Sequence, residues 1–184
     1  MPTQAAYLYW LIVGCETAFW VVLLLALAAR YLLRRERLSR ALLLSLPLVD
    51  LLLLAFTAVD LEAGTPATFA HGLASAYVGF TIAFGAVAVR WADAHFAYRF
   101  AGGPVPPGPP TGWIAVRYEL ELWLRSIVAW IIALVLLVAL IAYIDDAAVT
   151  QPLHDWFRYA IGSVFLWFVF GPVWSVVFFR RAAA

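Results

Sequence analysis

The chain has 184 residues, of which 66% are hydrophobic and 12% are charged, and its mean hydropathy is +0.93. Soluble domains contain roughly 45–50% apolar and about 25% charged residues. This composition therefore excludes a soluble globular domain and a disordered chain, and a single cysteine excludes a disulfide scaffold. The net charge of +1 excludes a nucleic-acid-binding protein, which needs a basic surface. We therefore expect an integral protein of the lipid bilayer.

Five apolar stretches are long enough to cross about 30 Å of hydrocarbon as α-helices. Their runs are continuously apolar, whereas the strands of a membrane barrel alternate between apolar and polar residues. The sequence therefore predicts an all-α, polytopic transmembrane helix bundle that forms one membrane domain over residues 1–184. The predicted spans are residues 5–29, 41–59, 68–90, 120–144 and 153–179, with a Pro/Gly-rich loop at residues 91–118.

The arginines predict the orientation of the bundle. The chain has no lysine, and ten of its 12 arginines fall on one side of the predicted spans. The positive-inside rule makes that side cytoplasmic, so we expect the N-terminus outside and the C-terminus in the cytoplasm. Residues 1–6 carry no positive charge, so we expect the first span to be an anchor and not a cleaved signal peptide. The opposite loops carry the acidic residues Asp60, Glu62, Asp145, Asp146 and Asp155.

Two further segments have recognisable patterns. Residues 102–112 (GGPVPPGPPTG) predict a stiff linker, and residues 91–100 before them predict an amphipathic segment at the membrane surface. Small residues recur every three or four positions along the third span, which predicts a face packed closely against another helix. These residues are Gly72, Ala76, Gly79, Ala83 and Ala86.

Two carboxyl groups lie deep in predicted spans, where each ionisable side chain costs roughly 2.5–3.5 kcal/mol to insert. Glu16 lies near the middle of the first span and Asp50 near the middle of the second. A short loop joins these spans, so both carboxyls come to a similar depth. If they face each other, repulsion and desolvation favour one shared proton, and the pair can exchange protons or hold a cation. The alternative is that each carboxyl is neutral and forms a hydrogen bond to a neighbouring helix, which only stabilises the packing of the bundle.

A polar track leads outward from Asp50. Thr57 lies two turns away on nearly the same helix face, Asp60 and Glu62 mark the outer mouth, and His71 begins the third span. The same face of the second span is apolar toward the cytoplasm. We therefore predict an ion or substrate site that opens to the outside, formed by Glu16, Asp50, Thr57, Asp60 and His71.

Other ionisable residues have simpler interpretations. His71 and His154 both lie near the outer surface, and either a metal or haem site or two interfacial hydrogen bonds would account for them. The sequence has no close histidine spacing that favours the metal. Arg125 lies little more than one turn inside the fourth span. Its side chain is expected either to extend toward the cytoplasmic membrane surface or to pair with Glu121.

The sequence contains no nucleophile elbow, phosphate loop, HExxH or Cys-x-x-Cys motif, and its single cysteine, Cys15, lies in an apolar stretch. We therefore predict no enzymatic activity, no metal site and no cofactor.

Residues 49–80 (VDLLLLAFTAVDLEAGTPATFAHGLASAYVGF), residues 90–103 (RWADAHFAYRFAGG) and parts of the first span (ETAFW and AARYLLRR) have a recognisable pattern. In these segments the chain resembles the YmcC-type family of small bacterial membrane proteins. The most distinctive parts are ATFAHGLA around His71 and WAD-x-x-F around Asp93. The resemblance implies a multi-pass protein of the bacterial inner membrane and implies no particular activity.

The leading functional hypothesis is transport or ion and proton handling through the midplane carboxylates. The alternatives are a non-catalytic membrane scaffold or accessory subunit, and a haem- or metal-binding membrane protein. The expected partners are the lipid bilayer and either a second copy of the chain or another membrane protein.

Overall fold

The computed structural model describes the backbone of residues 2–178, and the side chains of this range except those of residues 2–9, 12, 13, 15 and 16. The described residues form helices joined by short loops and contain no strand, which confirms the all-α bundle. The elements are α1 (Pro2–Tyr31), α2 (Glu36–Glu62), α3 (Phe69–Ala101), α4 (Gly112–Ile144), α5 (Ala147–Thr150), η1 (Gln151–His154), α6 (Asp155–Phe168), η2 (Val169–Val173) and α7 (Trp174–Val177).

Four helical segments are long and apolar enough to cross a membrane. They are Glu36–Glu62, Phe69–Ala101, Gly112–Ile144 and the run of elements from Ala147 to Val177. Helix α1 has the length of a span, and its described side chains form a shorter apolar stretch at Thr17–Tyr31. Large apolar side chains such as Leu44 and Trp113 are exposed, at 74% and 69%, as expected of a surface that faces lipid.

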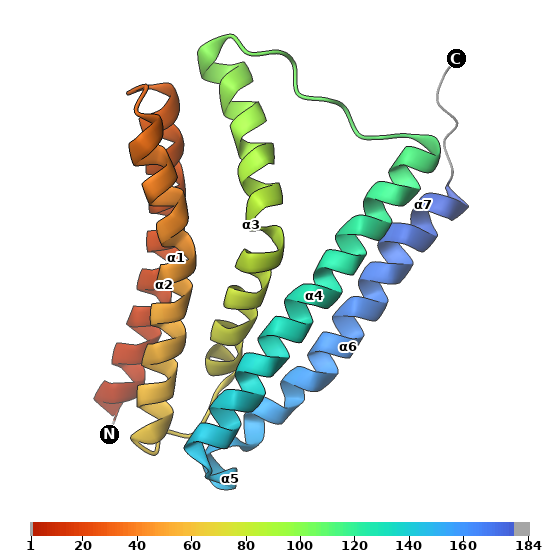
Figure 1. Ribbon diagram of the computed structural model, residues 1–184. Helices are drawn as coiled ribbons and strands as arrows, with labels where there is room; N and C mark the ends of the chain where they lie inside the picture. Colours follow the sequence, from red (N-terminus) through yellow and green to blue (C-terminus); the bar gives the residue numbers. More distant parts are fainter. Residues whose placement is uncertain (1, 179–184) are drawn as a thin grey trace.

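Each long helix packs against the next one along the chain (Figure 1). Helices α1 and α2 run side by side with α3 next to them, and α4 packs along α6. Helices α3 and α4 meet at one end and diverge toward the other, where residues 102–111 connect them. We call the first end the acidic end, because it holds residues 60–68 and 145–155. The second is the arginine-rich end, because it holds residues 30–40 and the 102–111 loop.

Helix α3 extends further than its predicted span. It continues through residues 91–101, which the sequence predicts as part of a loop, and ends at Gly102 in the left-handed conformation with φ 65°. Residues 91–101 contain no glycine or proline, and a polar composition alone does not stop helical hydrogen bonding. The linker between α3 and α4 is therefore confined to residues 102–111.

The extension of α3 carries a contact with α1. The Asp93 carboxylate forms a 3.3 Å ion pair with Arg30, and the Tyr31 hydroxyl donates to the Asp93 carbonyl oxygen at 3.1 Å. The ring of Tyr31 also lies 6.1 Å from that of Phe96. These contacts fasten α1 to α3 at the arginine-rich end.

The small-residue face of α3 is confirmed over four of its five positions. A methyl group added at Gly79 would meet the backbone of α4 at Ala129, and one added at Gly72 would meet the Trp156 indole. Ala76 and Ala83 are buried, whereas Ala86 is exposed.

Candidate functional site

The acidic end contains a buried pair of ionisable side chains. The Nε2 atom of His71 lies 3.0 Å from Oδ2 of Asp60, and the two residues are only 4% and 7% exposed. The second carboxylate oxygen of Asp60 accepts a hydrogen bond from the Thr65 hydroxyl at 3.1 Å. The structure thus brings together two residues that the sequence placed at the outer mouth, and both lie beneath the surface.

The first turn of α3 determines the tautomer of His71. Thr68 is the N-cap residue, and its backbone N–H donates to Nδ1 of His71 at 3.0 Å. Because Nδ1 accepts this bond, it carries no proton, and the neutral imidazole has its proton on Nε2. Nε2 therefore donates to Asp60. The Thr68 hydroxyl lies 2.9 Å from Nδ1, and Thr68 is an exposed residue.

The loop before α3 holds this arrangement in place. Gly64 has a φ of 84°, a left-handed conformation that lets the chain turn sharply after α2. The Ala67 N–H then donates to the Val149 carbonyl at 2.9 Å, which joins the loop to α5. Trp156 packs on the Gly72 backbone and stacks on Phe69, with ring centroids 4.7 Å apart. These contacts hold the first turn of α3, which carries His71, against α5 and α6.

Asp50 lies deeper on the same pair of helices. It is 6% exposed, its carboxyl lies near the Thr81 hydroxyl of α3, and its Oδ2 atom has no hydrogen-bond partner among the described residues. Asp50 precedes Asp60 by ten residues, and Thr81 follows His71 by ten. The two pairs therefore share one antiparallel register, about 15 Å apart along the helices. This spacing is about half of the hydrocarbon thickness.

Between these two pairs lies Thr57. It is fully buried, and its hydroxyl has no hydrogen-bond partner among the described side chains and backbone. Asp50, Thr57 and Asp60 thus lie on one buried face of α2, which faces α3. Ser75, buried on α3, donates to the carbonyl of Gly72 in its own helix. The α2–α3 interface therefore contains polar groups from its acidic end to mid-depth.

The remaining predicted residues lie elsewhere or are not described. The side chain of Glu16 is outside the described residues, so its position relative to Asp50 remains a prediction. Glu62 is exposed, with the Tyr143 hydroxyl 3.4 Å from its carboxylate. His154 is exposed and lies against Phe157. Within the described part of the chain, no three His, Cys, Asp or Glu side chains gather as a metal site would require.

The sequence analysis missed three threonines of this region. Thr65 and Thr68 flank the buried pair, and Thr81 pairs with Asp50. The Thr-x-x-His spacing of a helix cap was a usable signal for Thr68. The position of Thr81 opposite Asp50 can be inferred from the register of α2 and α3 only once Asp60 and His71 are known to face each other.

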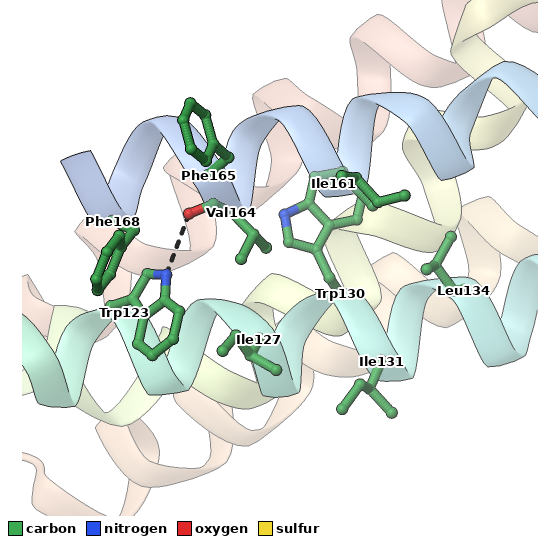
Figure 2. Close-up of a pocket in the computed structure, with 10 residues that line it drawn as sticks. Trp123, Ile127, Trp130, Ile131, Leu134, Ile161, Val164, Phe165 and Phe168 are labelled. Carbon is green, nitrogen blue, oxygen red and sulfur yellow. Dashed lines mark hydrogen bonds between the residues drawn. The ribbon is translucent and has the colours of Figure 1, made fainter. Parts of the chain in front are cut away.

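A groove of a different kind lies between α4 and α6 (Figure 2). It encloses about 450 Å³ and is lined by apolar and aromatic side chains, with Trp123 and Trp130 on α4 and Val164 and Phe165 on α6. The only polar atom of Trp123 is used internally, because Nε1 donates to the Val164 carbonyl at 3.1 Å. The groove therefore offers an apolar surface for packing and no polar group that could bind or react with a ligand.

Long apolar helices with lipid-facing side chains define the chain as a multi-pass membrane protein. It is 41% identical over 144 residues to the "Uncharacterized membrane protein YmcC" of Bacillus subtilis (strain 168), and the alignment covers 78% of each protein. The chain belongs to the YmcC family, as its resemblance in sequence predicted. It matches no family model and no solved structure.

Proposed function

We propose that the protein handles protons or small cations at the α2–α3 interface, with Asp50 as the mid-depth acceptor. The single observation that supports this most strongly is the Asp50 carboxyl, which is buried at mid-depth with one oxygen unpartnered among the described residues. A buried carboxylate without compensation is costly in lipid, so the group gains stability by taking up a proton or a cation.

The Asp60–His71 pair is the entrance of the proposed route. The imidazole lies between the hydroxyl of the exposed residue Thr68, at Nδ1, and the Asp60 carboxylate, at Nε2. When Nδ1 takes up a proton, Nε2 can release its own proton to Asp60. The ring thus transfers a proton from one side to the other while it stays in place. This step requires the bond from the Thr68 N–H to Nδ1 to open.

From Asp60 the proposed route continues along α2. The Thr57 hydroxyl both donates and accepts, which suits a position between two carboxyls. On this proposal water molecules complete the path between Asp60 and Asp50. Glu16 is proposed as a second carboxyl at the depth of Asp50.

Proton flux into proteoliposomes tests the proposal. The purified protein would be reconstituted around a trapped pH-sensitive dye, and a membrane potential imposed with potassium and valinomycin. We expect the unaltered protein to acidify the vesicles faster than protein-free liposomes do, and Asp50→Asn to lower the rate to the protein-free level. The matched control is Glu36→Gln, which neutralises an exposed acid at the opposite end of the same helix and should leave the rate unchanged.

Two results would refute the proposed function. One is an unaltered protein that is no faster than empty liposomes for protons and, in parallel assays, for sodium and potassium. The other is an Asp50→Asn variant with full activity. Correct folding of the variant would be checked by its circular dichroism and its elution as a single species.

A second candidate function, a non-catalytic scaffold, is favoured by the apolar groove between α4 and α6. A groove with no polar lining suits an apolar helix of a second copy or of another membrane protein. On this alternative, the mass of the protein–detergent complex in a mild detergent corresponds to an assembly of several chains. A monomer of 20.4 kDa protein mass would contradict it.

A further inference from the structure

The proposed function leaves a cation in the spanning part of α4 unexplained. Nη1 of Arg125 donates to the carbonyl oxygen of Ala83 on α3, at 3.3 Å. Ala83 precedes Arg90 by seven residues, a rise of about 10 Å from the arginine-rich side of α3. The guanidinium therefore bonds α3 well inside its apolar stretch and not at its edge.

This contact leaves the charge of Arg125 uncompensated. A peptide carbonyl is neutral, and within a helix it already accepts a backbone hydrogen bond. Among the described residues, the arginines with ion pairs are Arg30, Arg40 and Arg158, so Arg125 has no carboxylate partner, and the predicted pair with Glu121 is not formed. A guanidinium has five N–H donors. At this depth an unpaired charge is energetically costly, so a bound anion would stabilise the guanidinium.

The packing of α3 and α4 defines where Arg125 lies along the two helices. The helices are in close contact where Gly79 faces the Ala129 backbone, and the Arg125–Ala83 bond lies one turn nearer the arginine-rich end. Beyond it the two helices diverge (Figure 1). Arg90 is exposed and lies on the same face of α3 as Ala83, because seven residues complete nearly two helical turns. Arg125 and Arg90, neither of which has an ion pair among the described residues, thus lie one after the other toward the arginine-rich end.

We propose that Arg125 binds a phosphate group that enters between α3 and α4 from the arginine-rich end, with Arg90 at the entrance. Phosphate accepts paired hydrogen bonds from guanidinium, which makes arginine well suited to this ligand. The phosphate of an anionic phospholipid and a soluble phosphate share this chemistry. This binding site is separate from the α2–α3 interface and does not depend on the proposed proton route.

Lipid binding by the delipidated protein tests the proposal. Phosphatidylglycerol or phosphatidylcholine would be titrated into the full chain in detergent, and bound lipid counted by native mass spectrometry. We expect the unaltered protein to bind phosphatidylglycerol about tenfold more tightly than phosphatidylcholine, a difference of about 1.4 kcal/mol. Arg125→Gln keeps a donor for the Ala83 carbonyl but removes the charge, and it should lose this preference. Arg117→Gln removes an exposed arginine of the same helix and should keep it.

A competition with inorganic phosphate separates the two sources of the ligand. Displacement of phosphatidylglycerol by millimolar phosphate would support a soluble phosphate compound as the ligand, and no displacement would support the phospholipid. Equal affinity of the unaltered protein for both lipids, without displacement by phosphate, would overturn the proposal, and this result needs no variant to fold. A well-folded Arg125→Gln variant with the full lipid preference would also overturn it.

Discussion

Replacement of His71 by alanine is expected to lower the free energy of unfolding by about 3–5 kcal/mol, because it leaves the buried Asp60 charge without its partner. Asp60 would keep only the Thr65 hydroxyl, and the Thr68 N–H at the start of α3 would lose its acceptor. Reversible unfolding of the purified protein with a denaturing detergent in mixed micelles measures this loss.

His95→Ala is the matched control for this prediction. His95 lies on the same helix, is exposed, and bonds only the carbonyl of Trp91 one turn before it. Its removal should change the free energy of unfolding by less than about 0.5 kcal/mol.

A double-mutant cycle separates the pair from the general packing of the site. Asp60→Leu and His71→Leu should each destabilise the protein, whereas the double variant should cost less than the sum of the two by about 1–3 kcal/mol. Removing both polar partners leaves neither buried and unpaired. Additive costs would show that the two side chains do not depend on each other, contrary to their 3.0 Å contact.

The architecture was predictable because a bilayer constrains a chain strongly. Backbone groups in lipid must be satisfied within each segment, so hydropathy alone identifies spanning helices. Hydropathy does not identify where a helix stops outside the lipid, which is why residues 91–101 were predicted as part of a loop. Their helix ends at Gly102, where a left-handed residue becomes possible.

The sequence grouped Glu16, Asp50, Thr57, Asp60 and His71 as one candidate site, since intramembrane polar residues are rare and these share a face, a depth or an end. It did not determine how these side chains lie relative to one another. The mutual bond of Asp60 and His71 depends on the turn at Gly64 and on helix rotation, which packing determines. For the same reason the sequence left two alternatives for Arg125, extension toward the membrane surface or a pair with Glu121 on its own helix. The close approach of α3 instead offers it the carbonyl of Ala83.

Gly79→Ala is expected to lower the free energy of unfolding by about 1–3 kcal/mol, because an added methyl group overpacks a well-filled interface. The new Cβ would meet the Ala129 carbonyl and lie 3.0 Å from the Ala133 nitrogen. These atoms belong to the α4 backbone and cannot rotate away as a side chain can, so the two helices must separate. The separation would also lengthen the bond from Arg125 to Ala83 on the next turn.

Gly85→Ala tests whether this cost comes from the interface and not from the loss of a glycine. Gly85 lies on the same helix, and an added methyl group would meet no atom within 4 Å. Alanine favours the helical conformation over glycine by about 1 kcal/mol, so Gly85→Ala should leave stability unchanged or raise it. The same gain in helix propensity applies to Gly79→Ala and partly offsets the cost of the new contact. The measured loss of unfolding free energy at Gly79 is therefore a lower limit on that cost. If both variants were equally stable in the detergent titration, α3 and α4 would not be packed through Gly79.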